Sequence, residues 1–364
     1  MSTLVIGAGP AGLAVAASLR SRGVDTVVLE RADHVAASWR RHYDRLHLHT
    51  TRRWSSLPGK PIPRRYGRWV ARDDVVAYLE DYARGLDVRT GVTVARVDAD
   101  GTDWVVSTTS GEHRARHVVV ATGYNHTPVP PAWPGIDSFP GEVLHASTYR
   151  NPAPFVGKDV LVVGVGNTGA ELAVDLAEGG ASSVRLAVRT PPHIVRRSNL
   201  GWPAQGTGIV VRHLPVPLVD AVARGISRVE VPDLSSYGLP RPTTGLYSRV
   251  LEGSVPVQDV GLIAAVQSRA VTPVAAVVGV EGADVLLADG SRVSPDVILA
   301  ATGYRRGLEP LVGHLGVLDD AGVPRSHGPR PARPGLYFTG YTNPISGMFR
   351  ELRIDAERIA RAIG

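Results

Sequence analysis

Two glycine motifs are the features of this sequence whose residue types and spacing could do chemistry. Residues 7–12 read GAGPAG and residues 164–169 read GVGNTG, so both fit the pattern G-x-G-x-x-G. The first glycine of this pattern allows a tight turn, the second lets backbone approach a pyrophosphate, and the third lets a helix pack on a strand. The N-terminus of the following helix then offers unpaired N–H groups to the phosphate charge. Each motif therefore predicts a dinucleotide site.

The residue that follows each motif at the end of the next strand distinguishes the two sites. Glu30 lies 18 residues after Gly12, where a carboxylate can accept hydrogen bonds from both hydroxyls of a ribose. Arg189, followed by Thr190, lies 20 residues after Gly169. A guanidinium there can pair with a 2′-phosphate, which a carboxylate would repel. The contrast predicts a flavin at the first motif and NADPH, in preference to NADH, at the second.

The absence of cysteine limits the chemistry further. The chain has no Cys, so it has no disulfide, thiolate metal site, cysteine nucleophile or redox dithiol. A protein that binds both a flavin and a nicotinamide passes hydride equivalents to a disulfide, to another redox centre or to oxygen. The sequence leaves four enzyme classes open: electron-transfer reductases, quinone reductases, oxidases and monooxygenases. We predict no metal site, because His47 and His49 share one face of a strand but have no further ligand cluster near in sequence.

The elements that must position these motifs repeat along the chain. Residues 3–6 and 159–163 read as buried strands, residues 13–22 and 170–178 as helices, and residues 26–30 and 184–189 as second strands. The strand VVV at 118–120 and the strand VIL at 297–299 each run into Ala-Thr-Gly-Tyr. This duplication predicts an α/β fold with two dinucleotide-binding domains. Residues 346–363 predict a final helix, whereas residues 193–260 are irregular and receive no assignment.

Composition and charge restrict the partners. The chain has 364 residues, of which 43% are hydrophobic, which is enough for a sizeable core. Its net charge of +6 comes almost wholly from arginines whose pairs are spread along the chain, which favours solvated or cofactor-binding roles over nucleic-acid binding. No apolar stretch approaches the roughly 20 residues of a membrane span, and no basic segment precedes the first strand. We expect a cytoplasmic protein without membrane insertion.

The stretch from Phe139 to Tyr149 is far more specific than either glycine motif. It reads FPGEVLHASTY and has all four defining positions of the fingerprint F-x-G-x-x-x-H-x-x-x-[YF], just before the second glycine motif. The chain therefore resembles the flavin-containing monooxygenases. Further stretches resemble the plant YUCCA-type subgroup, namely residues 39–40, 43–49, 54–58, 78–83, 237–242 and 256–261.

The resemblance implies a fold of the glutathione-reductase kind in which the NADPH domain is inserted into the FAD domain. The expected limits are 1–150 for the first part of the FAD domain, 151–306 for the NADPH domain and 307–364 for the second part of the FAD domain. By matching positions, the resemblance implies these FAD-binding residues: Gly7, Gly9, Gly12, Glu30, Trp39, Arg40, Leu46, His47, Val94, Gly340 and Tyr341. The NADPH-binding residues that it implies are Gly164, Gly166, Asn167, Gly169, Arg189 and Thr190.

The activity implied by the resemblance is an oxygen transfer. NADPH would reduce FAD, O2 would then form a C4a-(hydro)peroxyflavin, and a small organic substrate would take one oxygen atom. N- or S-oxygenation and attack on a ketone or 2-oxo acid all remain open, with His49 and Asn167 named as candidate catalytic residues. A reductase or oxidase that does not oxygenate its substrate is the alternative. A homodimer is a further expectation from the family.

Two departures from the family pattern bear on these expectations. Ala36-Ala37 stands where the family usually has Gly-Gly before the tryptophan, which affects backbone contacts in that loop. Residues 49–53, which read HTTRR, replace a different loop of the plant enzymes. The identity of the substrate is therefore left open at this point.

Overall fold

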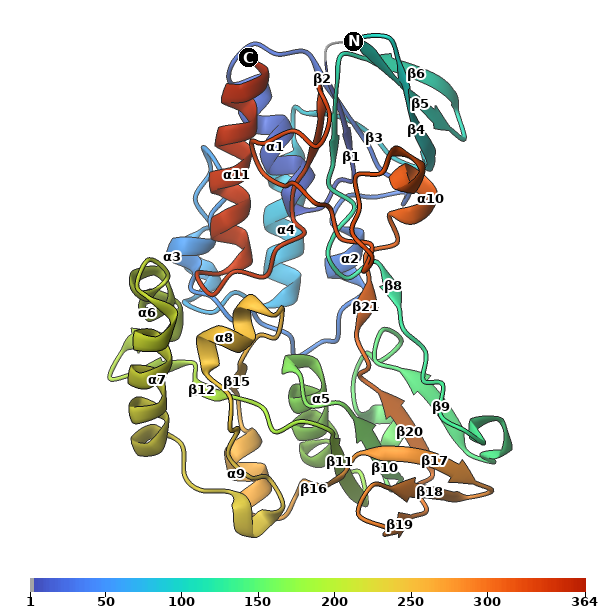
Figure 1. Ribbon diagram of the computed structural model, residues 1–364, viewed down its shortest axis with the longest axis vertical. Coiled ribbons are helices and arrows are strands. Elements are labelled where there is room, and N and C mark those ends of the chain that lie inside the picture. Colours follow the sequence, from blue (N-terminus) through green and yellow to red (C-terminus); the bar gives the residue numbers. More distant parts are fainter. Residues whose placement is uncertain (1–2) are drawn as a thin grey trace. The chain divides into compact units, whose positions relative to one another are not determined.

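The computed structural model describes residues 3–364 and divides into two compact units (Figure 1). Unit 1 comprises the residues up to 42, residues 46–127 and residues 304–364. Unit 2 comprises residues 43–45 and 128–303. These limits differ from the expected boundaries after residues 150 and 306. The reason for the earlier start of unit 2 is β9 (Glu142–His145), which pairs with β20 (Val297–Ala300) at the edge of the unit 2 sheet.

Unit 1 is built on a five-stranded parallel sheet in the order β22-β7-β1-β2-β3. Its strands are β1 (Thr3–Ile6), β2 (Thr26–Leu29), β3 (Asp87–Arg89), β7 (His117–Val120) and β22 (Leu336–Phe338). Strands β1, β7 and β22 are mostly apolar and are buried on both faces of the sheet, whereas the edge strand β3 is largely exposed. Its helices are α1 (Pro10–Arg20), α2 (Ala37–Arg40), α3 (Arg52–Ser55), α4 (Arg72–Ala83), α10 (Glu309–Val312) and α11 (Met348–Ile363).

The two faces of the unit 1 sheet have different covers. Helices α1, α4 and α11 lie together against one face (Figure 1), where Val5, Val28 and Val119 of the strands meet the apolar sides of the helices. An antiparallel sheet of β4 (Val94–Asp100), β5 (Asp103–Thr108) and β6 (Gly111–Ala115) supplies Val97, Trp104 and Val106 to the other core. Alternation along β1 sends successive side chains to opposite faces. The final helix expected over 346–363 is present as α11.

Unit 2 repeats the plan. Its parallel sheet has the order β16-β11-β10-β20-β9, with β10 (Asp159–Val163), β11 (Ser183–Val188) and β16 (Thr272–Ala275). Helices α5 (Asn167–Glu178) and α9 (Leu262–Gln267) pack together, and α5 also contacts β10 and β11. The antiparallel strands β17 (Val277–Glu281), β18 (Asp284–Leu287) and β19 (Arg292–Val293) share a core with the sheet. Both units are thus parallel sheets with a glycine-motif helix and an antiparallel meander.

The region that received no assignment from sequence is structured. Its helices are α6 (Ala204–Val211), α7 (Val216–Glu230) and α8 (Leu246–Leu251), and its strands are β12 (Ile194–Arg196), β13 (Ser198–Asn199), β14 (Trp202–Pro203) and β15 (Val257–Asp259). Two short strands, β8 (Thr127–Pro128) and β21 (Tyr304–Arg305), lie where the chain passes between the units. The single turns of 3-10 helix are 64–66, 136–138, 153–155, 235–237 and 313–315.

Candidate functional site

The first glycine motif forms a turn that needs glycine at its first and last positions. Gly7 has φ +107°, and a Cβ there would lie 2.6 Å from the carbonyl oxygen of Ala121. A Cβ on Gly12 would lie 1.9 Å from the oxygen of Gly7, because α1 packs directly on the end of β1. A Cβ on Gly9 would meet nothing within 4 Å. Gly7 and Gly12 are therefore fixed by the fold, whereas Gly9 faces open space at the N-terminus of α1.

Glu30 follows β2 directly and is held beside this turn. Its two carboxylate oxygens accept hydrogen bonds from the backbone N–H of Ala8 at 2.7 Å and of Ala32 at 2.9 Å. The side chain is only 8% exposed. A carboxylate has about four acceptor positions, so two remain after these bonds. The N–H of Val92 donates to the carbonyl oxygen of Glu30 at 2.9 Å, which brings the stretch leading to Val94 next to the same strand end.

The second glycine motif repeats the first almost atom for atom. Gly164 has φ +106° with its potential Cβ 2.7 Å from the oxygen of Ala301, and a Cβ on Gly169 would lie 1.9 Å from the oxygen of Gly164. Gly166, like Gly9, faces open space. In both units the first glycine needs a positive φ and no Cβ, and the last glycine needs no Cβ. These shared requirements explain why the two motifs have the same spacing. The N-terminus of α5 is thus left open, as is that of α1.

The strand end beside the second motif carries no carboxylate. The N–H of Gly7 donates to the carbonyl oxygen of Leu29, and the N–H of Gly164 donates to that of Ala187, so Leu29 and Ala187 are equivalent. The next residue is Glu30 in unit 1 and Val188 in unit 2. Arg189 and Thr190 follow it and are exposed. The side chain of Arg189 makes no hydrogen bond or ion pair with any residue from 3 to 364. An apolar side chain followed by an available guanidinium suits a phosphate at this position.

Asn167 is engaged by its own unit. Its amide N–H donates to the carbonyl oxygen of Pro256 at 3.1 Å, and its amide oxygen accepts the N–H of Gln258 at 2.8 Å. These two bonds fasten β15 to the first turn of α5. They account for an asparagine at this position through structure, and its roles in NADPH binding and catalysis stay predictions.

The fingerprint from Phe139 to Tyr149 has a physical explanation within unit 2. Phe139 packs in the core beside β10 and β20, and a Cβ on Gly141 would lie 2.3 Å from the oxygen of Asp296. His145 accepts the N–H of Ser147 at Nδ1, at 3.1 Å, so its Nε2 carries the proton and donates to the oxygen of Gly303 at 3.2 Å. Burial lowers the pKa of His145, which favours this neutral form.

Tyr149, the last fingerprint residue, belongs to a cluster of polar contacts on α5 that sequence reasoning missed. Its hydroxyl donates to Asp175 at 2.8 Å, and the hydroxyl of Tyr43 donates to Glu171 at 3.0 Å. Burial, together with these carboxylates, raises the pKa of both tyrosines. Arg45 pairs with Asp175 at 3.3 Å and with a second acid on α5 at 2.7 Å. Residues 43–45 therefore belong to unit 2 although the chain on either side of them belongs to unit 1. The acidic spacing of four and three residues on α5 was the available signal.

The residues expected to line a flavin lie around α2 and the segment after it. Trp39 makes edge contacts with Phe349 and His42, with ring centroids 5.7 and 5.6 Å apart. Arg40 forms an ion pair with Glu80 of α4. In the family position usually held by glycine, Ala36 has φ 58°, a left-handed conformation that glycine adopts more readily. The loop thus keeps the glycine-like turn despite the substitution.

The segment 46–49 is held in place mainly by its backbone. The oxygen of Leu46 accepts the N–H of Arg72 at 2.8 Å, and His47 forms an isolated bridge with Ala71. Leu46 is buried, His47 is exposed and His49 is half-buried. The backbone contacts position this stretch in unit 1, and they do not by themselves assign chemistry to His47 or His49.

Gly340 and Tyr341 lie at the end of β22. Gly340 has φ +85° and stands next to Ala11 of α1, 3.3 Å from its potential Cβ. Tyr341 accepts the N–H of Thr122 at 3.1 Å and contacts the hydroxyl of Thr122 at 2.9 Å. Burial raises the pKa of Tyr341 to about 12. The tyrosine thus ties this strand end to the first Ala-Thr-Gly-Tyr stretch, beside the first glycine motif.

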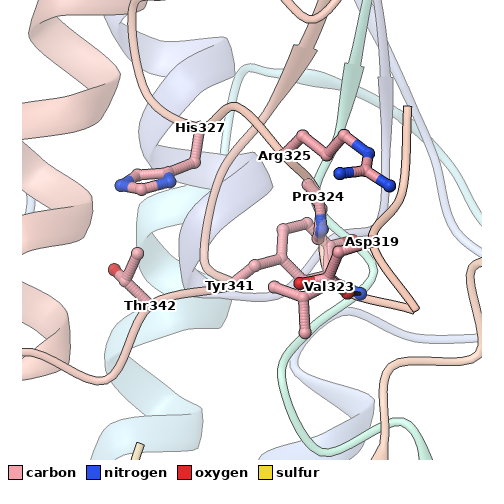
Figure 2. A pocket seen from close by; sticks show the side chains of 7 residues that line it. All are labelled: Asp319, Val323, Pro324, Arg325, His327, Tyr341 and Thr342. Carbon is pink, nitrogen blue, oxygen red and sulfur yellow. Dashed lines mark hydrogen bonds between the residues drawn. The ribbon is translucent and has the colours of Figure 1, made fainter. Parts of the chain in front are cut away.

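A pocket of about 420 Å³ opens on the other side of Tyr341 (Figure 2). Figure 2 shows His327 and Thr342 on one side of it and Arg325 on the other. The carboxylate of Asp319 accepts two backbone N–H groups of its own loop, and Arg325 donates to a nearby carbonyl oxygen. These polar groups serve the loop itself, and we assign no chemistry to this pocket.

Two negative findings concern the part of the chain that the structure describes. Within it, no three His, Asp or Glu side chains are arranged to hold a metal ion. None of its helices has both the length and the apolar character needed to cross a membrane.

Comparison with known proteins gives the family. A family profile described as pyridine nucleotide-disulphide oxidoreductase matches residues 4–200. Because the chain has no cysteine, the disulphide in that description does not apply to its chemistry. The indole-3-pyruvate monooxygenase YUCCA1 of Oryza sativa subsp. japonica is 39% identical over 350 residues, covering 93% of this chain and 86% of the rice protein. The probable indole-3-pyruvate monooxygenase YUCCA9 of Arabidopsis thaliana is 36% identical over 376 residues, covering 99% and 88%.

A solved structure agrees in fold. The flavin-containing monooxygenase from Stenotrophomonas maltophilia superposes with a TM-score of 0.72 at 24% identity, covering 99% of this chain and 98% of that one. The predicted fold class, two glutathione-reductase-like dinucleotide-binding domains, is confirmed. The chain belongs to the flavin monooxygenase family that includes the YUCCA-type enzymes, and it is an NADPH- and O2-dependent flavin monooxygenase.

Proposed function

We propose that the flavin is FAD and that unit 1 holds it. The observation that carries this proposal is the open space at Gly9, at the N-terminus of α1, next to a buried carboxylate with acceptor positions to spare. Gly7, Gly9 and Gly12 would admit the pyrophosphate, and Glu30 would accept the hydroxyls of the adenosine ribose. Val94 would contact the adenine through its backbone. Because a carboxylate at this place repels a 2′-phosphate, the site is suited to an adenosine without one.

NADPH would bind in unit 2 in the corresponding way. Gly164, Gly166 and Gly169 leave the N-terminus of α5 open, and Val188 replaces the carboxylate that would repel a 2′-phosphate. Arg189 is available to pair bidentately with that phosphate, and Thr190 lies beside it.

The residues around Trp39, Arg40, Leu46 and His47 would line the flavin, with Gly340 and Tyr341 on the side of β22. When bound, the flavin takes a hydride from NADPH and activates O2, chemistry that no amino-acid side chain supplies. The chain's own part is to hold both nucleotides, to exclude water and to orient the substrate. Tyr341 stays protonated at neutral pH because burial raises its pKa to about 12, so it can donate or accept a hydrogen bond but adds no charge beside the site.

We further propose that the substrate is a 2-oxo acid with an apolar or aromatic side chain. The support is that relatives named for indole-3-pyruvate match almost the whole chain at 36–39% identity. The balanced reaction is R-CO-COO⁻ + O2 + NADPH + H⁺ → R-COO⁻ + CO2 + H2O + NADP⁺. One oxygen atom enters the new carboxylate and the other leaves as water, while NADPH supplies the two electrons.

The test uses the purified, flavin-loaded protein. NADPH consumption, O2 uptake, H2O2 and acid product are measured together with phenylpyruvate, indole-3-pyruvate, a ketone, a tertiary amine and a thioether. One arylacetic acid formed per NADPH, with little H2O2, is the expected result for the 2-oxo acids. Coupled oxygenation of only the amine or thioether would overturn the proposed substrate. NADPH consumption that yields only H2O2 with every compound would favour an oxidase.

Location in the cytoplasm and assembly into a homodimer stay predictions. Fractionation of source cells tests the first, and the mass in solution by light scattering tests the second.

A further inference from the structure

One stretch of unit 1 has a much higher density of positive charge than the chain as a whole. Residues 51–72 contain seven cationic residues and no Asp or Glu, whereas the entire chain has a net charge of +6. The seven are Arg52, Arg53, Lys60, Arg64, Arg65, Arg68 and Arg72. Like charges in one short stretch repel one another, and carboxylates outside the stretch balance only some of them.

Three of the seven are occupied within unit 1. Arg52 donates to backbone carbonyl oxygens of the same stretch at 2.9 and 3.3 Å. Lys60 pairs with Asp81 at 2.6 Å, and Arg72 pairs with Asp73 at 2.8 Å. These contacts fold the stretch and anchor it to α4, and they leave its other cations to be explained.

Arg53 and Arg64 are exposed, and their side chains make no hydrogen bond or ion pair with any residue from 3 to 364. Arg65 lies over the ring of Tyr66, with its guanidinium carbon 4.8 Å from the ring centre. Arg68 lies over Trp69 in the same way at 5.3 Å. Arg65 also donates to the hydroxyl of Tyr66 at 3.3 Å. We therefore consider Arg53 among these cations, because its exposed side chain has no such contact.

The stretch is attached to the segment that we propose lines the flavin. The N–H of Leu48 donates to the oxygen of Val70 at 2.8 Å, and the N–H of Arg52 donates to that of Arg68 at 2.9 Å. The two ends of the stretch therefore lie side by side next to residues 46–49. Arg53 comes four residues after His49, in the first turn of α3. Half-buried Trp54 is its neighbour and supplies an apolar surface.

We infer that the 51–72 stretch recognises the carboxylate of the substrate, with Arg53 as a specificity-determining residue. This inference rests on the proposed function, because it places the anionic end of a 2-oxo acid beside the flavin-lining segment. A guanidinium can bind a carboxylate through two parallel N–H bonds, and the neighbouring arginines raise the local concentration of an anionic substrate. The aromatic rings interleaved with the cations suit the apolar part of the same molecule.

The experiment compares the flavin-loaded wild type with Arg53→Gln, Arg53→Lys and a control, Arg22→Gln. Arg22 is exposed in the turn after α1, and its replacement removes the same unit of net charge. The kinetic constants for phenylpyruvate are measured at about 50 and 250 mM salt. Direct binding of phenylpyruvate and of its methyl ester to the oxidised holoenzyme is followed in parallel by the change in flavin absorbance; the ester lacks the charge and cannot lose CO2, so it serves as a binding control only.

For Arg53→Gln we expect KM and the dissociation constant for phenylpyruvate to rise about tenfold, which is the loss of one charge-assisted bond at an exposed site. The dissociation constant for the ester should show no such difference, kcat for phenylpyruvate should change less than twofold, and Arg53→Lys should recover part of the affinity. Arg22→Gln should match the wild type. High salt should raise the wild-type KM for phenylpyruvate and leave the dissociation constant for the ester unchanged.

Each alternative outcome is distinguishable. If the wild type decarboxylates phenylpyruvate and Arg53→Gln does so with the same KM, this inference is overturned and the proposed function stands. If no 2-oxo acid is oxidised, the proposed function fails. The absorbance titration then decides the inference by itself, since equal binding of phenylpyruvate by wild type and Arg53→Gln overturns it. Arg53-dependent binding of a DNA duplex without binding of phenylpyruvate would overturn it in favour of a polyanion surface.

Discussion

The substitution Gly9→Ala tests FAD binding without disturbing folding. There is space for a methyl group at Gly9, whereas there is none at Gly12. Gly9 has φ −82° and ψ −177°, which alanine adopts freely, and a Cβ there would meet nothing within 4 Å. The lower backbone entropy of the unfolded alanine chain stabilises the protein by about 0.4–1 kcal/mol, and the poorer helix N-cap offsets this by a similar amount. The flavin-free Gly9→Ala protein should therefore unfold within about 0.5 kcal/mol of the wild type.

FAD binding should respond differently. If the pyrophosphate lies against this backbone, the added methyl group overpacks the contact by about 1–3 kcal/mol, which weakens FAD about 5- to 150-fold. Gly12→Ala should instead damage folding, because its Cβ would lie 1.9 Å from a backbone oxygen that cannot move aside. Gly166→Ala is the matched control, since it changes the same position of the second motif and should spare FAD while weakening NADPH.

The assay is a titration of flavin-free protein with FAD, followed by quenching of flavin fluorescence, together with denaturant unfolding of the same preparations. Wild-type affinity for FAD in Gly9→Ala would refute the placement of the pyrophosphate at this turn. Equal loss of FAD affinity in Gly9→Ala and Gly166→Ala would refute the division of labour between the two motifs.

Four further changes test the remaining parts of the site. Glu30→Gln has one carbonyl oxygen where two carboxylate oxygens accept backbone N–H groups, so FAD affinity should fall about tenfold or more; an unchanged fluorescence titration would contradict this. Arg189→Gln should raise KM for NADPH about 10- to 100-fold with little effect on NADH, and an equal rise for both in steady-state assays would exclude a contact with the 2′-phosphate. Tyr149→Phe removes the 2.8 Å bond to Asp175 and should lower the free energy of unfolding by about 1–2 kcal/mol, measured with denaturant; a change in KM for NADPH without loss of stability would contradict a structural role. Burial and a neighbouring arginine lower the pKa of His117 below its unfolded value of about 6.5. The unfolded state therefore binds more protons between those two pKa values, and Tm should fall as the pH drops from about 7.5 to 5.5, less so in His117→Gln.

The parts of the fold that sequence predicts are those fixed by local geometry. The turns at Gly7 and Gly164 need a positive φ and a missing Cβ, so their spacing alone identifies the strand, turn and helix around them. The same holds for the two Ala-Thr-Gly-Tyr stretches, which follow buried strands paired with β1 and β10. Glu30 and the open helix N-termini were predictable for the same reason.

The parts that sequence does not predict depend on distant contacts. Tyr43 reaches Glu171 across 128 residues, so nothing near residues 43–45 indicates that they belong to unit 2. Helix α7 differs, because its signal lies in its own sequence: Leu218, Val222 and Ile226 recur every four residues, which is the spacing of one helix face. That signal was missed among the prolines and glycines of residues 193–260, and the three residues are 44–51% exposed. Contacts place the start of the long segment of unit 2 at residue 128, and β9 pairs there with β20; the domain limits expected after residues 150 and 306 stay predictions.

Because unit 2 lies between the two main parts of unit 1 in the sequence, the ribosome completes unit 2 before unit 1. Unit 1 needs β22 beside β7 and α11 beside α1, and the pairing of Leu336 with Val118 spans more than 200 residues. All of unit 2, residues 43–45 included, has been made once residue 303 is added. The inserted unit can thus fold during synthesis while the unit around it waits for its last 61 residues, those from 304 to 364. Until then the strand edge of β7 that pairs with β22 and the face of α1 that contacts α11 stay uncovered, and an open strand edge of this kind can pair with other chains.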